Sequence, residues 1–189
     1  MKWNELEPDI KAKSLGTIVR KWSFIDAISL ISETNDLPMI IMNDEVRSKI
    51  YVHLKTKRVE LGGLLLGSVI SSCDLEDGIT VVSISDAVAS RDFNSTSVSL
   101  SMNSGVWQHA TEISDESTFV VGWYHSHPNL GAFFSGTDRS TQANFFHHPY
   151  SLGLVVDPIR NEEKWFLGAD SIEVNPQRVK GNLNGMALV

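Results

Sequence analysis

One stretch decides the fold around the candidate polar site: Phe119-Val120-Val121-Gly122-Trp123-Tyr124-His125-Ser126-His127-Pro128. Its apolar first part predicts a buried β-strand. Alternate residues of a strand point to the same face, so His125 and His127 can offer their imidazoles to one ion while Ser126 points away. Pro128 ends the strand because it has no N–H to donate to a neighbouring strand.

The residues after this strand predict a loop and then a helix that supplies a third ligand. Residues 129–134 include Gly131 and are typical of a loop. Ser135 suits the N-cap of the following helix, and Asp138 falls in its first turn. Two histidines and one carboxylate are a familiar set of protein ligands at a catalytic zinc site, where a fourth position stays open for water. We therefore predict a metal-dependent hydrolase in which His125, His127 and Asp138 bind one zinc ion.

A catalytic zinc site also needs a proton acceptor that is not itself a ligand. Glu60 precedes an apolar, glycine-containing segment, residues 61–67, that is typical of a central strand. A carboxylate at the start of such a strand is partly desolvated, and burial raises its pKa toward the range useful for general acid–base catalysis. Glu60 is therefore the predicted general base.

Each of these residues also has a structural interpretation. An isolated His-x-His pair at a strand end can be a hydrogen-bonded structural feature, and Glu60 alone could be a solvated charge. Ser135 can be a simple helix cap, and capping does not exclude a second role.

The remaining histidines and the cysteine predict no further metal site. His147 and His148 lie where the predicted helix ends, and His53 and His109 fall in amphipathic helical stretches. Cys73 is the only cysteine, so neither an internal disulfide nor a cysteine-rich zinc site can form. The Pro-Cys-x-x-Cys pair of nucleobase deaminases and the His-Glu-x-x-His helix of zincins are both missing from the sequence.

Together these segments resemble the motif of the JAMM (MPN-plus) zinc metalloprotease family. The motif reads Glu60-x-x-Gly63-x-Leu65-x-Gly67, then His125-Ser126-His127-Pro128, then Ser135-x-x-Asp138. The flanking segments Val121-Gly122-Trp123-Tyr124 and Val155-Val156-Asp157-Pro158 are similar to those of the proteasome-lid deubiquitinase and of prokaryotic JAB-domain peptidases. The resemblance covers residues 38–172.

The resemblance implies an isopeptidase that removes ubiquitin or a ubiquitin-like protein from lysine side chains, or that trims its C-terminal tail. His125, His127 and Asp138 would bind zinc, Glu60 would take a proton from water and return it to the departing amine, and Ser135 would donate a hydrogen bond to the oxyanion. It also implies an α/β fold with a mixed β-sheet flanked by helices, a cytidine-deaminase-like architecture. Proteins similar to E1 and E2 enzymes are expected partners.

The sequence does not define the role of the substrate loop or the pathway of the protein. In the JAMM family a loop corresponding to residues 89–96 holds the ubiquitin tail as an added strand, and here it is short. The chain also lacks the cysteine-containing insertion of members with a second zinc, so their linkage selectivity does not transfer. The alternatives are a non-catalytic MPN scaffold and a peptidase that trims a sulfur-carrier-like protein. A prokaryotic ubiquitin-like conjugation system, with antiviral defence as its setting, is the context that the resemblance suggests.

Composition is consistent with a compact cytoplasmic domain. The chain has 189 residues, is 42% hydrophobic and has a net charge of −7, which disfavours nonspecific nucleic-acid binding and suits a partner with a basic face. No apolar run approaches the length of a membrane span, and the N-terminus lacks a signal-peptide pattern. We expect a partly helical N-terminal extension (1–37), a catalytic domain (38–172) and a C-terminal tail (173–189) that is loosely ordered from Asn175 onward.

The apolar pattern predicts the following elements of the mixed sheet and its helices. Strands are expected at 39–42, 59–70, 79–87, 98–102, 119–124, 152–156 and 164–169, and helices at 44–57, 104–113 and 137–145. In the helix at 44–57, the main apolar positions are Val46, Ile50, Val52 and Leu54.

Overall fold

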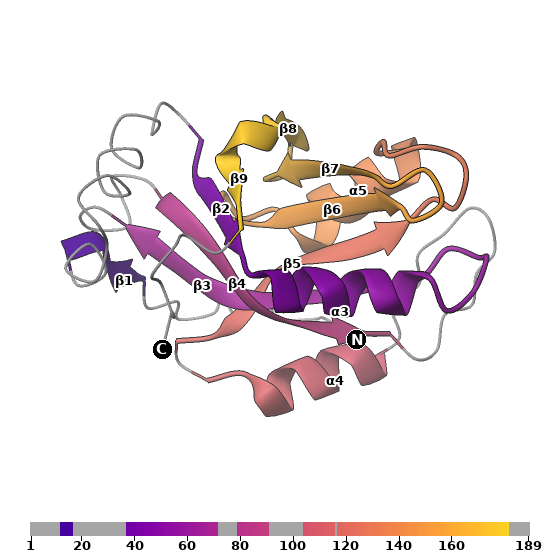
Figure 1. The fold of residues 1–189 in the computed structure, drawn as a ribbon. Coiled ribbons are helices and arrows are strands. Elements are labelled where there is room, and N and C mark those ends of the chain that lie inside the picture. The colour runs from indigo at the N-terminus through magenta and orange to yellow at the C-terminus, as the bar shows by residue number, and fades with distance from the viewer. Residues whose placement is uncertain (1–11, 17–36, 72–78, 91–103, 116, 182–189) are drawn as a thin grey trace.

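One mixed β-sheet organises the molecule (Figure 1). The computed structural model describes residues 12–16, 37–71, 79–90, 104–115 and 117–181. The strands are β1 (Lys13–Ser14), β2 (Met39–Met42), β3 (Gly62–Ser71), β4 (Ile79–Ala89), β5 (Phe119–Ser126), β6 (Leu152–Asp157), β7 (Glu162–Leu167), β8 (Ile172–Val174) and β9 (Val179–Lys180). The helices are α3 (Asp44–Leu54), α4 (Ser104–Ile113) and α5 (Gly136–Phe145), with one short 3-10 helix, η2 (Pro176–Arg178).

The strands follow the order β8-β7-β6-β5-β3-β4-β2-β9, and β1 pairs with the end of β3. The long hairpin of β3 and β4 and the neighbouring pair of β3 and β5 are antiparallel, whereas β5 and β6 are parallel. This order places β5 between β3 and β6, so hydrogen bonds from both neighbouring segments hold the end of β5. Ser126 donates its N–H to Leu61 O, and His127 donates its N–H to Val156 O, both at 2.9 Å.

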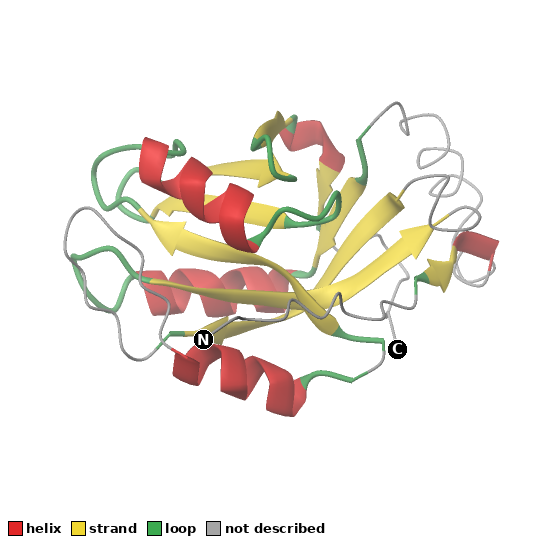
Figure 2. Cartoon of the chain, turned by 180° about the vertical axis from the view of Figure 1, so that it is seen from behind, coloured by secondary structure: helices red, strands yellow, loops and turns green. Residues whose placement is uncertain are grey.

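Helices cover both faces of the sheet, and each face has its own apolar core. Helix α3 crosses the face seen in Figure 1 and buries Val46, Ile50 and Leu54 against it. The view from behind shows α5 on the opposite face (Figure 2), and the core there also includes residues of α4. Strand alternation separates the two cores, because Trp123 contributes to the second one while its neighbour Tyr124 contributes to the first.

The predicted fold class, a mixed sheet flanked by helices, is confirmed. Helix α3 corrects one detail, since it ends at Leu54 rather than Lys57 and leaves Val52 66% exposed. Val46, Ile50 and Leu54 recur every four residues and share one face of the helix, whereas Val52 lies on the opposite face. The chain reverses soon after β7 ends at Leu167, through Gly168 at φ 65°.

The C-terminal part of the chain corrects another expectation. Residues 175–181 are not loosely ordered, because η2 leads into β9, which pairs with β2, and the Arg178 side chain donates to Leu37 O. β8 pairs with β7, so the sheet continues beyond residue 172. The predicted strand at 98–102, the turn at 72–78, most of the substrate loop and most of the N-terminal extension lie outside the described residues. Within the described residues, no helix is both long and apolar enough to cross a membrane.

Candidate active site

Two buried histidines converge at the end of β5. His125 is fully buried and His127 is 4% exposed. Their Nε2 atoms lie 3.2 Å apart, with the ring centroids separated by 4.8 Å. The intervening Ser126 points the other way, where its Oγ accepts the N–H of Leu61 at 3.1 Å. The alternation expected of a strand therefore places both imidazoles on one side of the sheet.

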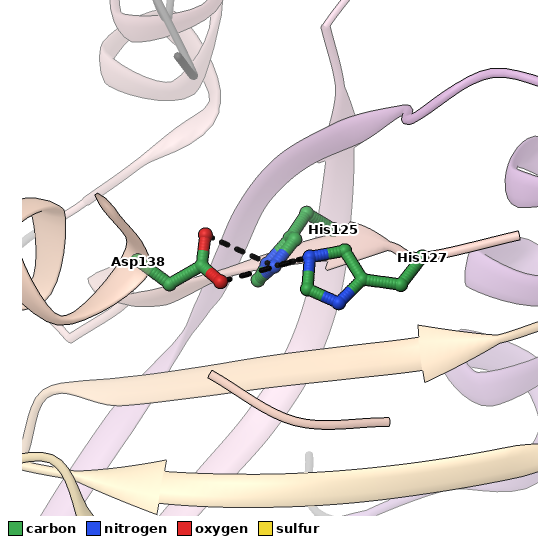
Figure 3. A group of neighbouring side chains, drawn as sticks. All are labelled: His125, His127 and Asp138. Atoms are coloured by element: carbon green, nitrogen blue, oxygen red, sulfur yellow. Dashed lines mark hydrogen bonds and ion pairs between the residues drawn. The ribbon is translucent and has the colours of Figure 1, made fainter. Parts of the chain in front are cut away.

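Helix α5 brings a buried carboxylate to the same point. Ser135 is the N-cap, and a capping box joins it to Asp138: the Ser135 N–H donates to Asp138 Oδ2 at 2.6 Å, and the Asp138 N–H donates to Ser135 Oγ at 3.2 Å. This reciprocal pair fixes the first turn and the direction of the Asp138 side chain. Asp138 Oδ1 lies 3.3 Å from His125 Nε2, and Oδ2 lies 3.6 Å from His127 Nε2 (Figure 3).

The three side chains fit a zinc ion. With zinc–nitrogen and zinc–oxygen bonds of about 2 Å and tetrahedral angles, ligand atoms lie roughly 3.3 Å apart. The two Nε2 atoms are 3.2 Å apart, Asp138 Oδ1 lies 3.3 Å from His125 Nε2, and the second oxygen, Oδ2, lies 3.6 Å from His127 Nε2, so each imidazole faces a different oxygen of the carboxylate. Among the described residues, these three form one group of buried potential ligands whose donor atoms lie within 4.8 Å of one another. Two imidazole nitrogens and one carboxylate oxygen suit zinc and leave a fourth position open.

The protonation states also suit metal binding. Burial, with the adjacent His125, lowers the pKa of His127 to about 4, so its imidazole is neutral at pH 7 and can act as a ligand. Burial alone would raise the pKa of Asp138, but its interactions with His125 and the hydrogen bonds to Ser135 lower it to about 2. The carboxylate is therefore ionised at neutral pH.

At the Nδ1 edge of the two imidazoles, ring packing takes the place of a hydrogen bond. The Nδ1 atoms of His125 and His127 are buried and have no hydrogen-bond partner among the residues that the structure describes. Instead, Trp123 stacks on His125 with centroids 4.6 Å apart and planes 9° apart, and Phe133 lies against His127 with centroids 4.8 Å apart. A metal-bound histidine usually donates its second ring N–H to an acceptor, so the aromatic neighbours have that orienting task here.

Glu60 lies beside the triad but precedes the strand that it was expected to open. β3 begins at Gly62, and Glu60 Oε1 lies 3.8 Å from His127 Nε2 with the Glu60 side chain 28% exposed. The bonds between Leu61 and Ser126 hold this segment against the end of β5. Partial burial raises the pKa of Glu60, an effect opposed by His125 and reinforced by Asp138. A carboxylate in this position can accept a proton from water at the open position.

Asp157 fixes the loop that follows His127. This fully buried residue accepts backbone N–H groups from Asn129 at 3.0 Å and Gly131 at 2.8 Å, and others from Ile159 and Arg160. The loop contains two residues with positive φ, Asn129 at 64° and Gly131 at 91°. The carboxylate therefore sets the path from the end of β5 to the start of α5.

The structure brings Glu60, Ser135 and the three predicted ligands together and leaves the other histidines outside this group. His147 and His148 follow α5, as expected, and are not part of the ligand cluster. His53 Nδ1 lies 2.9 Å from the Tyr124 hydroxyl on the other face of β5, and His109 lies exposed on α4.

Sequence reasoning assigned no role at the site to Trp123, Gln142 or Asp157. Gln142 is a buried residue of α5, and its Oε1 accepts the indole N–H of Trp123 at 2.6 Å. The sequence contained one signal for Gln142, which lies four residues after Asp138 and therefore on the same face of the helix. Asp157 ends a wholly apolar run, an unusual place for a carboxylate without a function.

The chain is similar in sequence to two kinds of curated protein. COP9 signalosome complex subunit 5b of Arabidopsis thaliana is 32% identical over 120 residues, which are 59% of this chain and 31% of that protein. The 26S proteasome regulatory subunit rpn11 of Schizosaccharomyces pombe is 49% identical over 43 residues, 22% of this chain and 14% of that protein. The chain thus spans less than a third of the length of these curated relatives.

Fold and family are shown by two further comparisons. The solution structure of protein DSY2949 from Desulfitobacterium hafniense superposes with a TM-score of 0.59 at 18% identity, covering 76% of this chain and 93% of that one, which supports the fold alone. The family described as prokaryotic homologs of the JAB domain matches residues 43–167. This match covers most of the chain and confirms the resemblance drawn from the motif, so the protein belongs to the family of prokaryotic homologs of the JAB domain.

Proposed function

We propose that this protein is a zinc-dependent peptidase that cleaves the bond after the C-terminal tail of ubiquitin or a ubiquitin-like protein. The observation that supports it best is the convergence of the buried side chains of His125, His127 and Asp138, a donor set that suits zinc, with the Glu60 carboxylate 3.8 Å from His127. The JAB/MPN family includes JAMM metalloisopeptidases and also non-catalytic members. A complete ligand set with an adjacent carboxylate favours the catalytic kind.

Three groups of residues divide the chemistry in this proposal. His125, His127 and Asp138 hold the ion, which when bound acts as a Lewis acid and makes water more acidic. Glu60 accepts a proton from the attacking water and donates it to the departing amine, and the raised pKa of this carboxyl favours both steps.

Ser135 is placed to stabilise the oxyanion of the same reaction. The helix cap uses Ser135 Oγ only as an acceptor, at 3.2 Å from the Asp138 N–H. The hydroxyl hydrogen can therefore donate to the oxygen of the scissile carbonyl as negative charge develops there.

The substrate assignment rests on relatives rather than on a contact in the structure. The JAMM motif and the similarity to subunits of the COP9 signalosome and the 26S proteasome favour a ubiquitin-like modifier. A net charge of −7 favours a substrate with a basic surface near its tail. We place the chain in a prokaryotic ubiquitin-like conjugation pathway with E1-like and E2-like partners, and antiviral defence is the setting that we propose for it.

The test is cleavage of ubiquitin and ubiquitin-like fusion proteins by the zinc-loaded protein. Glu60→Gln should retain zinc but lose cleavage by about 10²- to 10⁴-fold, the usual contribution of a general base. Glu45→Gln, which changes an exposed glutamate of α3, should cleave like wild type. Bound zinc with cleavage unaffected by Glu60→Gln would contradict the role of Glu60. Cleavage only of sulfur-carrier-like fusions would assign the protein to biosynthesis, and failure to bind zinc would favour a scaffold.

A further inference from the structure

A second side chain of α5, besides Asp138, joins this helix to the strand that ends at the histidines. Gln142 lies on α5 one turn after Asp138 and is fully buried. Its Oε1 accepts the indole N–H of Trp123 on β5 at 2.6 Å. Trp123 is itself fully buried and stacks on His125 with planes 9° apart. A chain of contacts therefore leads from α5 through Gln142 and Trp123 to the His125 ring.

The other polar atom of Gln142 fixes this side chain to the surrounding backbone. Gln142 Nε2 donates to Phe146 O, at the end of α5, and to Ser151 O, just before β6, both at 3.0 Å. Gly153 on β6 makes the room, since a Cβ there would lie 2.8 Å from Gln142 Oε1 and 2.3 Å from a ring carbon of Phe134. The Gln142 side chain thus has one satisfied and sterically defined position.

His125 needs such a support because it lacks the usual one. Metal-bound histidines are normally oriented by a hydrogen bond from the second ring nitrogen, whereas His125 Nδ1 has no partner among the described residues. The indole that stacks on the His125 ring is held in turn by its hydrogen bond to Gln142, so this bond ties the ring to the helix of the carboxylate ligand.

We propose that the pair Trp123–Gln142 is the positioning element of the metal centre, which sets the separation between Asp138 and His125. The inference rests on the proposed zinc centre and assigns to these residues no contact with substrate. Because the bond has one donor and one acceptor, loss of either residue should loosen the ligand geometry while leaving all three ligands in place.

The test compares zinc affinity in two variants of adjacent β5 residues. Trp123→Phe keeps an aromatic ring on His125 and removes the indole N–H. Tyr124→Phe removes one hydrogen bond to a helix too, but its partner is His53 on α3, which supplies no ligand. We expect Trp123→Phe to bind zinc roughly ten- to a hundredfold more weakly, the usual effect of losing an outer support. Tyr124→Phe should stay within about twofold, because its bond supports no ligand.

The measurement is competition with a chromogenic zinc chelator, at a temperature where circular dichroism shows each metal-free variant to be folded. The visible absorption of the Co²⁺-loaded protein gives a second readout, which should change in Trp123→Phe and not in Tyr124→Phe. Lower stability alone would alter neither quantity in a folded protein. Equal zinc affinity in wild type and Trp123→Phe, or equal weakening by Tyr124→Phe, would overturn the proposal.

Gln142→Met removes the acceptor of the same hydrogen bond and roughly keeps the side-chain volume. If both residues act through one bond, the double variant Trp123→Phe/Gln142→Met should bind zinc no more weakly than the weaker single variant. Multiplicative losses would show that the residues act separately and would contradict the proposal. Wild-type protein that binds no zinc would instead refute the metal centre, and the positioning role with it.

Discussion

At the scale of single residues, Ser135 combines a structural and a chemical task in one hydroxyl group. Its oxygen caps α5 and its hydrogen is available to an oxyanion. The two tasks can be separated, because glycine is tolerated at an N-cap almost as well as serine, whereas alanine is not. Ser135→Ala should cost about 1 kcal/mol of unfolding free energy, and Ser135→Gly only a few tenths.

Cleavage should respond differently from stability in the same two variants. Neither has a hydroxyl, so both should lose about 10²- to 10³-fold in kcat. Urea unfolding of the metal-free proteins and cleavage of one fusion substrate give the two quantities. A Ser135→Gly variant with wild-type kcat would show that Ser135 is a cap and nothing more.

At the scale of single residues, the sequence also predicted which side chains converge at the candidate site. The spacing of His125, Ser126 and His127 fixes their alternation in any strand, and the cap at Ser135 fixes where α5 begins. The bond between Trp123 and Gln142 could not be recognised in this way, because it joins residues of different elements whose packing no local pattern reveals. Val52 was named among the main apolar positions of its helix, but it lies away from the face that Val46, Ile50 and Leu54 share and is exposed.

At the scale of elements, Gly153 decides how closely α5 and its N-terminal loop approach β6. A Cβ at this position would meet a ring carbon of Phe134 at 2.3 Å and Gln142 Oε1 at 2.8 Å, and both side chains are buried. Gly153→Ala should therefore destabilise the protein by about 3 kcal/mol, as overpacked cores do. It should also weaken zinc binding, since Gln142 would have to move.

A second glycine provides the control for this prediction. Gly105 lies in α4, where an added Cβ meets nothing within 4 Å. Gly105→Ala should stabilise the protein by roughly 0.5–1 kcal/mol, because alanine loses less backbone entropy in a helix. Thermal and urea unfolding measure both variants. A Gly153→Ala variant as stable as wild type would mean that α5 can shift without cost.

The prediction of elements succeeded where the apolar pattern was long. It failed where a strand is defined only by its pairing with a neighbouring strand. The extended apolar runs of β3, β5 and β6 predicted strands close to the observed ones. β8 and β9 are three and two residues long, too short for any periodicity, and exist because β7 and β2 offer free edges to them. Such strands follow from the whole sheet rather than from their own sequence.

At the scale of the whole molecule, the site lies where two other parts of the chain meet the end of the central strand β5. The segment before β3 supplies Glu60, β5 supplies the histidines, and α5 supplies Asp138. A carboxylate at the end of β6, Asp157, accepts four backbone N–H groups and joins the loop after β5 to the turn after β6. The integrity of the site should therefore depend on the ionisation of Asp157.

Acid should reveal this dependence in the metal-free protein. Burial opposes ionisation, but the hydrogen bonds from Gly131, Arg160, Asn129 and Ile159 lower the pKa of Asp157 from 3.8 to about 2. The unfolded chain then binds a proton at a higher pH than the folded one, so this residue stabilises the fold fully above pH 4. That contribution is lost as the pH falls from about 4 toward 2.

Asp157→Asn isolates the effect, because an amide supplies fewer acceptor sites and brings its own N–H groups toward the four backbone donors. At pH 7 the variant should be less stable by about 3 kcal/mol, and the difference from wild type should narrow as the pH falls below 4. Urea unfolding with a chelator present, in steps from pH 7 to pH 3, measures both curves without interference from zinc. Asp170→Asn, which changes an exposed aspartate, should stay within about 0.5 kcal/mol of wild type. A difference for Asp157→Asn that is constant with pH would mean that packing rather than charge fixes the loop after His127.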